Sequence, residues 1–89
     1  MNSHDKQQLE AIIEADILKE TGIMACVTIR RDYRTSVPYE EITILHSPKE
    51  GEDFEKQVHL RCETIYQNTF HDIADHIIEH LGFPRLAKK

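Results

Sequence analysis

The sequence lacks several features that mark well-defined classes of protein. No apolar run approaches the ~20 residues that a membrane-spanning helix needs. The segment MNSHDKQQLE lacks the basic start and apolar block of a secretory signal. Glycine is scarce, and Gly22, Gly51 and Gly82 fall where helices or turns are expected to end, so no glycine-rich phosphate loop is present. These absences favour a cytoplasmic protein without such a nucleotide-binding loop.

Cysteine is also scarce, and no catalytic motif stands out. Cys26 and Cys62 fall in expected strands without C-x-x-C spacing, which favours two buried, reduced thiols, with a disulfide between adjacent strands as the alternative. No serine or cysteine has a histidine and an acid placed beside it by any visible pattern. We therefore expect no catalytic residues, no cofactor and no enzymatic activity.

What the sequence does contain is a balance typical of a small globular domain. Of its 89 residues 39% are hydrophobic and 30% charged, with a net charge of −5. This length allows one domain with a thin core, at about residues 4–83, followed by a basic segment at 84–89. The negative net charge argues against wholesale binding to phosphate backbones. Positive charge gathers in two places: Arg30, Arg31 and Arg34, then Arg85, Lys88 and Lys89.

The strongest local pattern is an amphipathic helix within residues 68–84. Six apolar residues fall on one face at helical spacing: Phe70, Ile73, Ala74, Ile77, Ile78 and Leu81. Thr69 followed by Asp72 is typical of a helix start, and Gly82 followed by Pro84 is typical of a helix stop. The apolar face predicts a sheet packed beneath it.

A first helix is expected from residue 3 to about residue 20, capped by Asn2 or Ser3 and ended at Thr21–Gly22. Its apolar residues form two stripes. One contains Leu9, Ile13 and Ile17, and the other contains Ala11, Ala15 and Leu18 together with Ile12. The second stripe is either noise in a short helix or a self-association surface formed by Ala11, Ala15 and Leu18.

Three strand-like runs separate the helices, at residues 23–31, 39–46 and 54–66, with turns at 32–38 and 47–53. Short connections favour an antiparallel meander, so the order α-β-β-β-α predicts a two-layer α+β fold with both helices on one face of a three-stranded sheet. The core face is expected to carry Val27, Ile29, Ile42, Ile44, Val58, Leu60 and Cys62, with His46 at its end. The opposite face is expected to carry Thr28, Arg30, Thr43, Leu45, His59 and Arg61.

The exposed side of the last helix contains a polar ladder. Asp72, His76 and His80 lie four residues apart, and a histidine pair at this spacing can chelate a divalent metal. The alternative is a solvated face whose charges follow the helix dipole. The H-E-x-x-H order of zinc proteases is absent, so we expect no metal, with these three residues as the weak candidates.

The basic segment from Arg30 to Ser36 is the most promising recognition surface. Arginine and tyrosine are enriched at binding hot spots, and side chains at a strand turn are not needed for the core. The alternative is a solvated hairpin tip. The predicted partner-binding residues are Arg30, Arg31, Tyr33, Arg34, His59 and Arg61.

The order α-β-β-β-α resembles that of the double-stranded RNA-binding domain. That family has a lysine-rich start to its last helix, whereas this chain has the acidic sequence Asn68-Thr69-Phe70-His71-Asp72, so the resemblance covers topology and not RNA binding. In size and charge the chain also looks like the small acidic proteins with which phages block host defence enzymes.

We therefore expect a non-enzymatic protein-binding module. Its most concrete form is a phage-type inhibitor, of the anti-CRISPR or anti-restriction kind, that covers a surface of a larger host nuclease, ribonucleoprotein or defence complex. The alternatives are an RNA- or DNA-binding module that uses the basic hairpin, and a metal-dependent enzyme built on the last helix. A homodimer is a further expectation.

Overall fold

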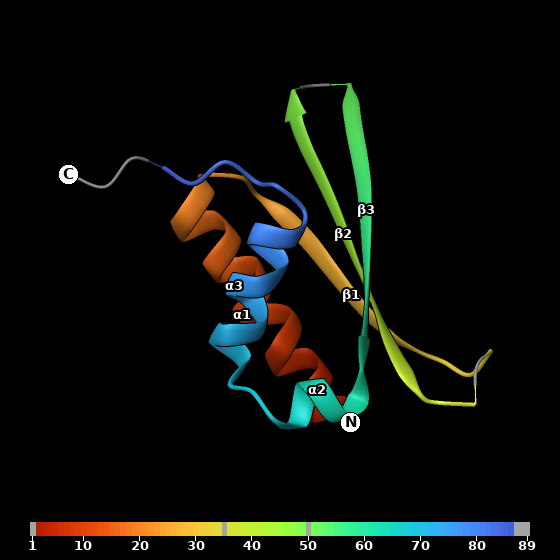
Figure 1. The fold of residues 1–89 in the computed structure, drawn as a ribbon. Coiled ribbons are helices and arrows are strands. Elements are labelled where there is room, and N and C mark those ends of the chain that lie inside the picture. Colours follow the sequence, from red (N-terminus) through yellow and green to blue (C-terminus); the bar gives the residue numbers. More distant parts are fainter. Residues whose placement is uncertain (1, 35, 50, 87–89) are drawn as a thin grey trace.

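The structure, a computed structural model, describes residues 2–34, 36–49 and 51–86. Helix α1 (Ser3–Thr21) precedes strands β1 (Ala25–Asp32), β2 (Tyr39–Lys49) and β3 (Glu52–Arg61), which are followed by helices α2 (Cys62–Tyr66) and α3 (Phe70–His80). The strands form one antiparallel sheet in the order β1-β2-β3. Both long helices lie on the same side of the sheet, as Figure 1 shows, so the predicted α+β architecture is confirmed.

Helix α3 has the caps and the buried face that its sequence predicts. The Thr69 hydroxyl accepts a hydrogen bond from the Asp72 amide at 3.1 Å, and Gly82 adopts a left-handed φ of +72° after the helix. The residues buried on its inner face are Ile73, Ala74, Ile77 and Ile78. The helix therefore contributes the centre of its apolar stripe to the buried core, and Phe70 and Leu81 at its two ends pack against that core partly buried.

Helix α1 uses one of its two apolar stripes for the core. The Asn2 side chain accepts from the Asp5 amide at 2.8 Å, and Gly22 has a φ of +74° with its amide bonded to the Leu18 carbonyl. Leu9, Ile13 and Ile17 are fully buried against the sheet and α3, and Ile12 is partly buried. The stripe of Ala11, Ala15 and Leu18 faces away from the core, and Leu18 remains 47% exposed.

The core face of the sheet follows the predicted alternation. Val27 pairs with Ile44, and Ile29 with Ile42, which in turn pairs with Val58; all five side chains are buried. His46 ends this row as expected and is buried between two aromatic rings, 5.6 Å from Phe54 and 5.1 Å from Phe83 between ring centroids. Burial and the nearby Lys56 ammonium lower the pKa of His46, which favours the neutral form of the ring.

The predicted third strand is too long. The strand ends at Arg61, and Cys62–Tyr66 instead form the single helical turn α2, with Ile65 buried. The Cys62 amide bonds to the Pro38 carbonyl at 3.3 Å, which marks the point where the chain leaves the sheet. Five residues are too few for a helical period to be visible in the sequence.

The turn predicted at residues 47–53 is too long, because both flanking strands continue into this segment. Strand β2 continues to Lys49 and β3 begins at Glu52, with a register shift after His46 and Gly51 at a φ of +83°. The β2–β3 hairpin therefore extends past the helices, as Figure 1 shows. Ser47, Glu52 and Asp53 are exposed, so the described side chains of this segment lie in an exposed hairpin arm.

The prediction that both cysteines are buried is wrong, whereas the prediction that they are not joined by a disulfide is confirmed. Cys26 is exposed on the helix-free face of the sheet, Cys62 is half-buried, and both are free thiols. Among the described residues no helix combines the length and the apolar character needed to cross a membrane.

The edge of the sheet at β1 is bonded to helix α1. Glu14 Oε2 accepts a hydrogen bond from the Val27 amide at 3.0 Å, and Glu10 Oε2 accepts one from the Ile29 amide at 2.8 Å. The fit is geometric, because one helical turn rises about 5.4 Å and two strand residues span about 6.6 Å. The two carboxylates take the place of a neighbouring strand.

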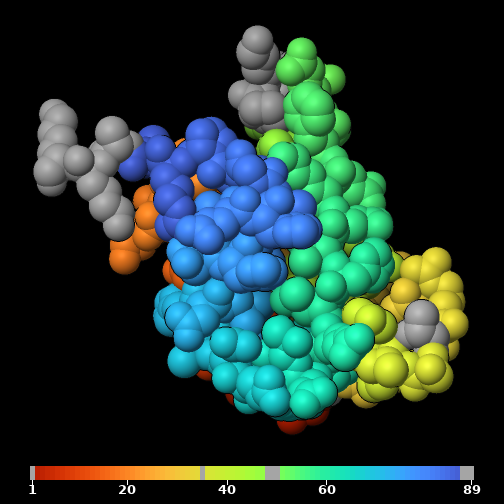
Figure 2. Space-filling model, in the orientation of Figure 1, coloured from red at the N-terminus to blue at the C-terminus, as the bar shows by residue number. Residues whose placement is uncertain are grey.

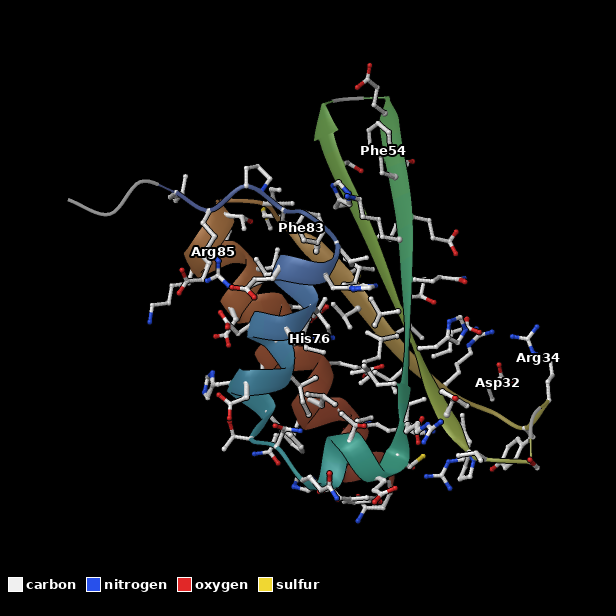
Figure 3. The ribbon with its side chains drawn as sticks, in the orientation of Figure 1. Asp32, Arg34, Phe54, His76, Phe83 and Arg85 are labelled. Carbon is white, nitrogen blue, oxygen red and sulfur yellow. The ribbon has the colours of Figure 1, made fainter. Side chains whose placement is uncertain are left out.

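The segment after α3 ties that helix to α1. Phe83 is buried, and the Leu86 amide bonds to the Glu20 carbonyl at 2.7 Å. The Arg85 guanidinium lies 3.4 Å from a Glu20 carboxylate oxygen and also binds the carboxylate of Asp75 on α3. Arg85, placed by sequence in a basic tail, thus bridges two helices, as Figure 3 shows. Residues 87–89 lie outside the described part of the chain.

Candidate interaction surfaces

The helix-free face of the sheet carries three of the predicted partner-binding residues. Cross-strand pairing places Arg30 beside Glu41 and Glu41 beside His59, and the next row pairs Tyr39 with Arg61. We call this side of the sheet, which carries Arg30, Tyr39, Glu41, His59 and Arg61, the open face. Within the described part of the chain no helix packs on it, as Figure 1 shows. The sequence therefore placed Arg30, His59 and Arg61 on one surface correctly.

Arg34 lies at the end of the open face, and its guanidinium forms ion pairs with acidic side chains of the same chain. Its guanidinium binds the Asp32 carboxylate at 2.7 and 3.0 Å and lies 3.9 Å from Glu41, as Figure 3 shows for the labelled pair. The hydrogen bonds from the Arg34 side chain and then from its amide lower the pKa of Asp32 to about 2. Asp32 therefore stays ionised and holds Arg34 in place.

Asp32, Glu41 and His59 also form the one described triplet of acidic, cysteine and histidine side chains whose ligand atoms all lie within 4.8 Å. The histidine is 3.6 Å from the Glu41 carboxylate. Positive charge at this point comes from Arg34, so a metal ion would have to displace a bidentate guanidinium. Sequence reasoning missed this cluster, because its members come from three strands and become neighbours only through the register.

The polar ladder of α3 does not gather three ligands in this way. His76 and His80 stack with their ring centroids 5.7 Å apart, and both are exposed. Asp72 lies at the start of the helix, where its amide is used by the Thr69 cap. The expectation that the ladder holds no metal remains a prediction.

Arg31 does not point into the open face. It bonds through Nε and Nη2, at 3.1 and 3.0 Å, to the same oxygen of Glu40, whose side chain is fully buried. The Cys62 thiol lies 3.7 Å from that oxygen, and the other Glu40 oxygen has no partner among the described residues. The hydrogen bond to Glu40 raises the pKa of Arg31. The expectation that this arginine is not needed by the core is therefore wrong.

The remaining predicted residues are accessible. Tyr33 is 79% exposed directly after β1, and Arg30 is exposed on β1. Arg61 donates a long hydrogen bond of 3.4 Å to the Tyr39 hydroxyl. Arg30, Tyr33, Tyr39 and Arg61 therefore provide recognition groups that the core does not use.

The predicted self-association stripe lies on the opposite side of α1 from the core. Ala15 and Leu18 line a shallow hollow together with Met24, which is 79% exposed. The stripe is apolar and accessible, so its role in self-association stays a prediction.

Comparison with protein families, with curated proteins and with solved structures finds no match to this chain. Its function must therefore be argued from the surfaces themselves.

Proposed function

We propose that this chain is a non-enzymatic module that binds a larger protein through its open face. The observation that carries the proposal is the gathering of Arg30, His59 and Arg61 on one uncovered side of the sheet, together with Tyr33, which is exposed directly after β1. Arginine and tyrosine are the residues that most often anchor protein interfaces. Glu41 and Asp32 lie among them, so the surface presents both signs of charge.

This mixture favours a protein partner over a nucleic acid. Two of the three arginines of the basic hairpin are already paired with carboxylates, Arg31 with Glu40 and Arg34 with Asp32. A phosphate backbone would meet a surface whose cations are largely neutralised, on a chain of net charge −5. A protein with acidic and basic groups in complementary positions suits it better.

The most concrete version is an inhibitor that covers a surface of a larger nuclease or defence complex. The likeness of this small acidic chain to phage proteins of that kind supports it. An inhibitor of this type needs a presented surface and a rigid scaffold, and it needs no catalytic group.

The test is capture of a partner by two matched variants. The double variant Arg30→Gln with Tyr33→Ser removes two accessible groups and leaves the ion pairs of Arg31 and Arg34 intact. Because a hot-spot truncation typically costs ~2 kcal/mol or more, affinity should fall at least about 30-fold. Lys19→Gln on the helix side serves as the control and should retain binding.

Equal affinity of parent and double variant for the captured protein would contradict the proposal. Retention of nucleic acid in place of protein, with an affinity that falls steeply with salt, would favour the nucleic-acid alternative instead.

A further inference from the structure

The two edge strands of the sheet, β1 and β3, differ in whether their outward backbone groups have hydrogen-bond partners. At β1 the outward amides of Val27 and Ile29 are bonded to α1 carboxylates. Because peptide groups alternate along an antiparallel strand, the backbone of Ile44, opposite Val27, is directed at β3 and pairs there with Lys56. The peptide groups of Glu55, Gln57 and His59 therefore point away from the sheet.

The outer edge of β3 is open to pairing. Within the described part of the chain, no hydrogen bond links those outward peptide groups to another element. Figure 2 shows β3 (green) at the surface beside α3 (blue). Proteins usually cover, charge or distort such an edge, because a long open strand is a template for another strand.

The charges on this strand are arranged in a self-complementary order. Along the open face β3 carries Asp53 and Glu55 in its first half, neutral Gln57 at the centre, and His59 and Arg61 in its second half. A second copy running antiparallel, with Gln57 opposite Gln57, places Glu55 opposite His59 and Asp53 opposite Arg61. Each of these two contacts occurs twice across the two-fold axis.

The helix side of β3 is complementary in the same register. Phe54 is 47% exposed near the end of the hairpin, as Figure 3 shows, and this register places it opposite Leu60 of the second copy. Leu60 borders a hollow of about 150 Å³ that is also lined by Ile73 and His76 of α3. An exposed aromatic ring and a partly apolar hollow therefore meet at each end of the pairing.

Neighbouring registers lack this match. A shift in one direction brings Lys56 opposite Lys56, which opposes like charges. A shift in the other direction leaves Asp53 without a partner and puts Phe54 opposite Cys62, which already belongs to α2. One register thus satisfies charge and apolar contact together.

We propose that two copies of this chain pair through β3 in that register and form a continuous antiparallel sheet, three strands from each copy. The two open faces then lie on the same side of the joined sheet, which doubles the surface described above. The pairing uses His59 and Arg61, which also belong to the open face, but it does not use Arg30 or Tyr33. The double variant Arg30→Gln with Tyr33→Ser therefore tests the proposed partner without removing a residue of the pairing.

The register is tested by cross-linking in a background of Cys26→Ser and Cys62→Ser. Directly opposed residues with outward peptide groups have Cα atoms ~5.5 Å apart, within disulfide reach. Gln57→Cys should therefore oxidise to a covalent dimer. Glu55→Cys is the control and should not, because its own copy lies ~13 Å along the strand. Equal cross-linking of the two variants, or none by Gln57→Cys, would overturn the register.

The pairing itself is tested by sedimentation of the full chain. Asp53→Arg and Arg61→Asp should each raise the dimer dissociation constant at least about tenfold, because each replaces two attractions with two repulsions. The combined variant should restore the parent value. Leu18→Glu should remain a dimer, which separates β3 pairing from self-association through α1. A parent chain that stays monomeric at millimolar concentration, or a dimer lost only in Leu18→Glu, would refute the proposal.

Discussion

Arg31 and Arg34 of the β1–β2 hairpin show that residue type alone does not predict whether an arginine is exposed or paired with a buried acid. Arg34 pairs with an acid two residues away on the surface, whereas Arg31 compensates the buried carboxylate of Glu40. The alternation of Glu40, Ile42, Ile44 and His46 predicts that Glu40 faces the core. It was not assigned to the core face because it is charged. The sequence therefore contained the signal for the buried pair, and the expectation that acids are exposed outweighed it.

The arginines should differ sharply in their effect on stability. Arg31→Ala leaves a buried carboxylate without its counter-ion, so the free energy of unfolding should fall by about 3 kcal/mol. Arg34→Ala removes an exposed pair and should cost less than about 1 kcal/mol. Urea denaturation of both variants measures the difference. Similar losses in the two variants would show that Glu40 is not held as the structure describes.

The Asp32–Arg34 pair gives a prediction about pH. Arg34 holds the folded-state pKa of Asp32 at about 2, below the ordinary value of 3.8. At any pH above the ordinary pKa of 3.8 the ionised Asp32 carboxylate therefore stabilises the fold. This contribution is lost as the pH falls through the folded-state pKa of about 2. Carbon-detected NMR titration should place the midpoint there in the parent chain. Arg34→Gln should raise it toward 3.8, whereas Arg30→Gln should leave it unchanged.

At the scale of elements, prediction from sequence succeeded where a pattern was long and capped. Helix α3 has a clear apolar stripe from Ile73 to Ile78 between Thr69 and Gly82, and it formed as expected. The five residues of α2 have no period to detect, and Ile65 with Tyr66 favour a strand locally. The open face was predictable because its side chains alternate, but which of them pair depends on the register between strands.

The facing of α3 is tested by two adjacent substitutions. Ile77 is fully buried and His76 is exposed, so Ile77→Asp should unfold the domain by placing an unpaired carboxylate in a thin core. His76→Ala should change the melting temperature little. Circular dichroism of both variants is sufficient, and equal losses would mean that the helix faces the other way.

The bond between α1 and the β1 edge is testable in the same way. Glu10→Ala or Glu14→Ala removes the acceptor for one edge amide, so each should cost about 1 kcal/mol of stability. The amide of Ile29 should exchange with solvent faster in Glu10→Ala, and that of Val27 in Glu14→Ala. Glu63→Ala, on α2, should accelerate neither. Amide exchange that is unaffected by all three variants would argue against these hydrogen bonds.

The whole molecule is a meander with a helix on either side of it in the sequence. Sequence analysis found this order from hydrophobic periods and from turns rich in Gly, Pro and Asp. It did not find how the helices are held together, because Arg85 and Leu86 meet Glu20 only in the folded chain. Contacts between residues so far apart in sequence leave no local pattern.

These closing contacts have a consequence for the kinetics of folding. The strand pairings of the meander join residues close in sequence, so they can form early, whereas the Arg85–Glu20 bridge closes a long loop. Contacts absent from the transition state slow unfolding without speeding folding. Arg85→Ala should therefore raise the unfolding rate and leave the folding rate nearly unchanged in stopped-flow chevron measurements. The bridge therefore prolongs the lifetime of the folded chain by slowing unfolding, and it has little effect on the rate of folding.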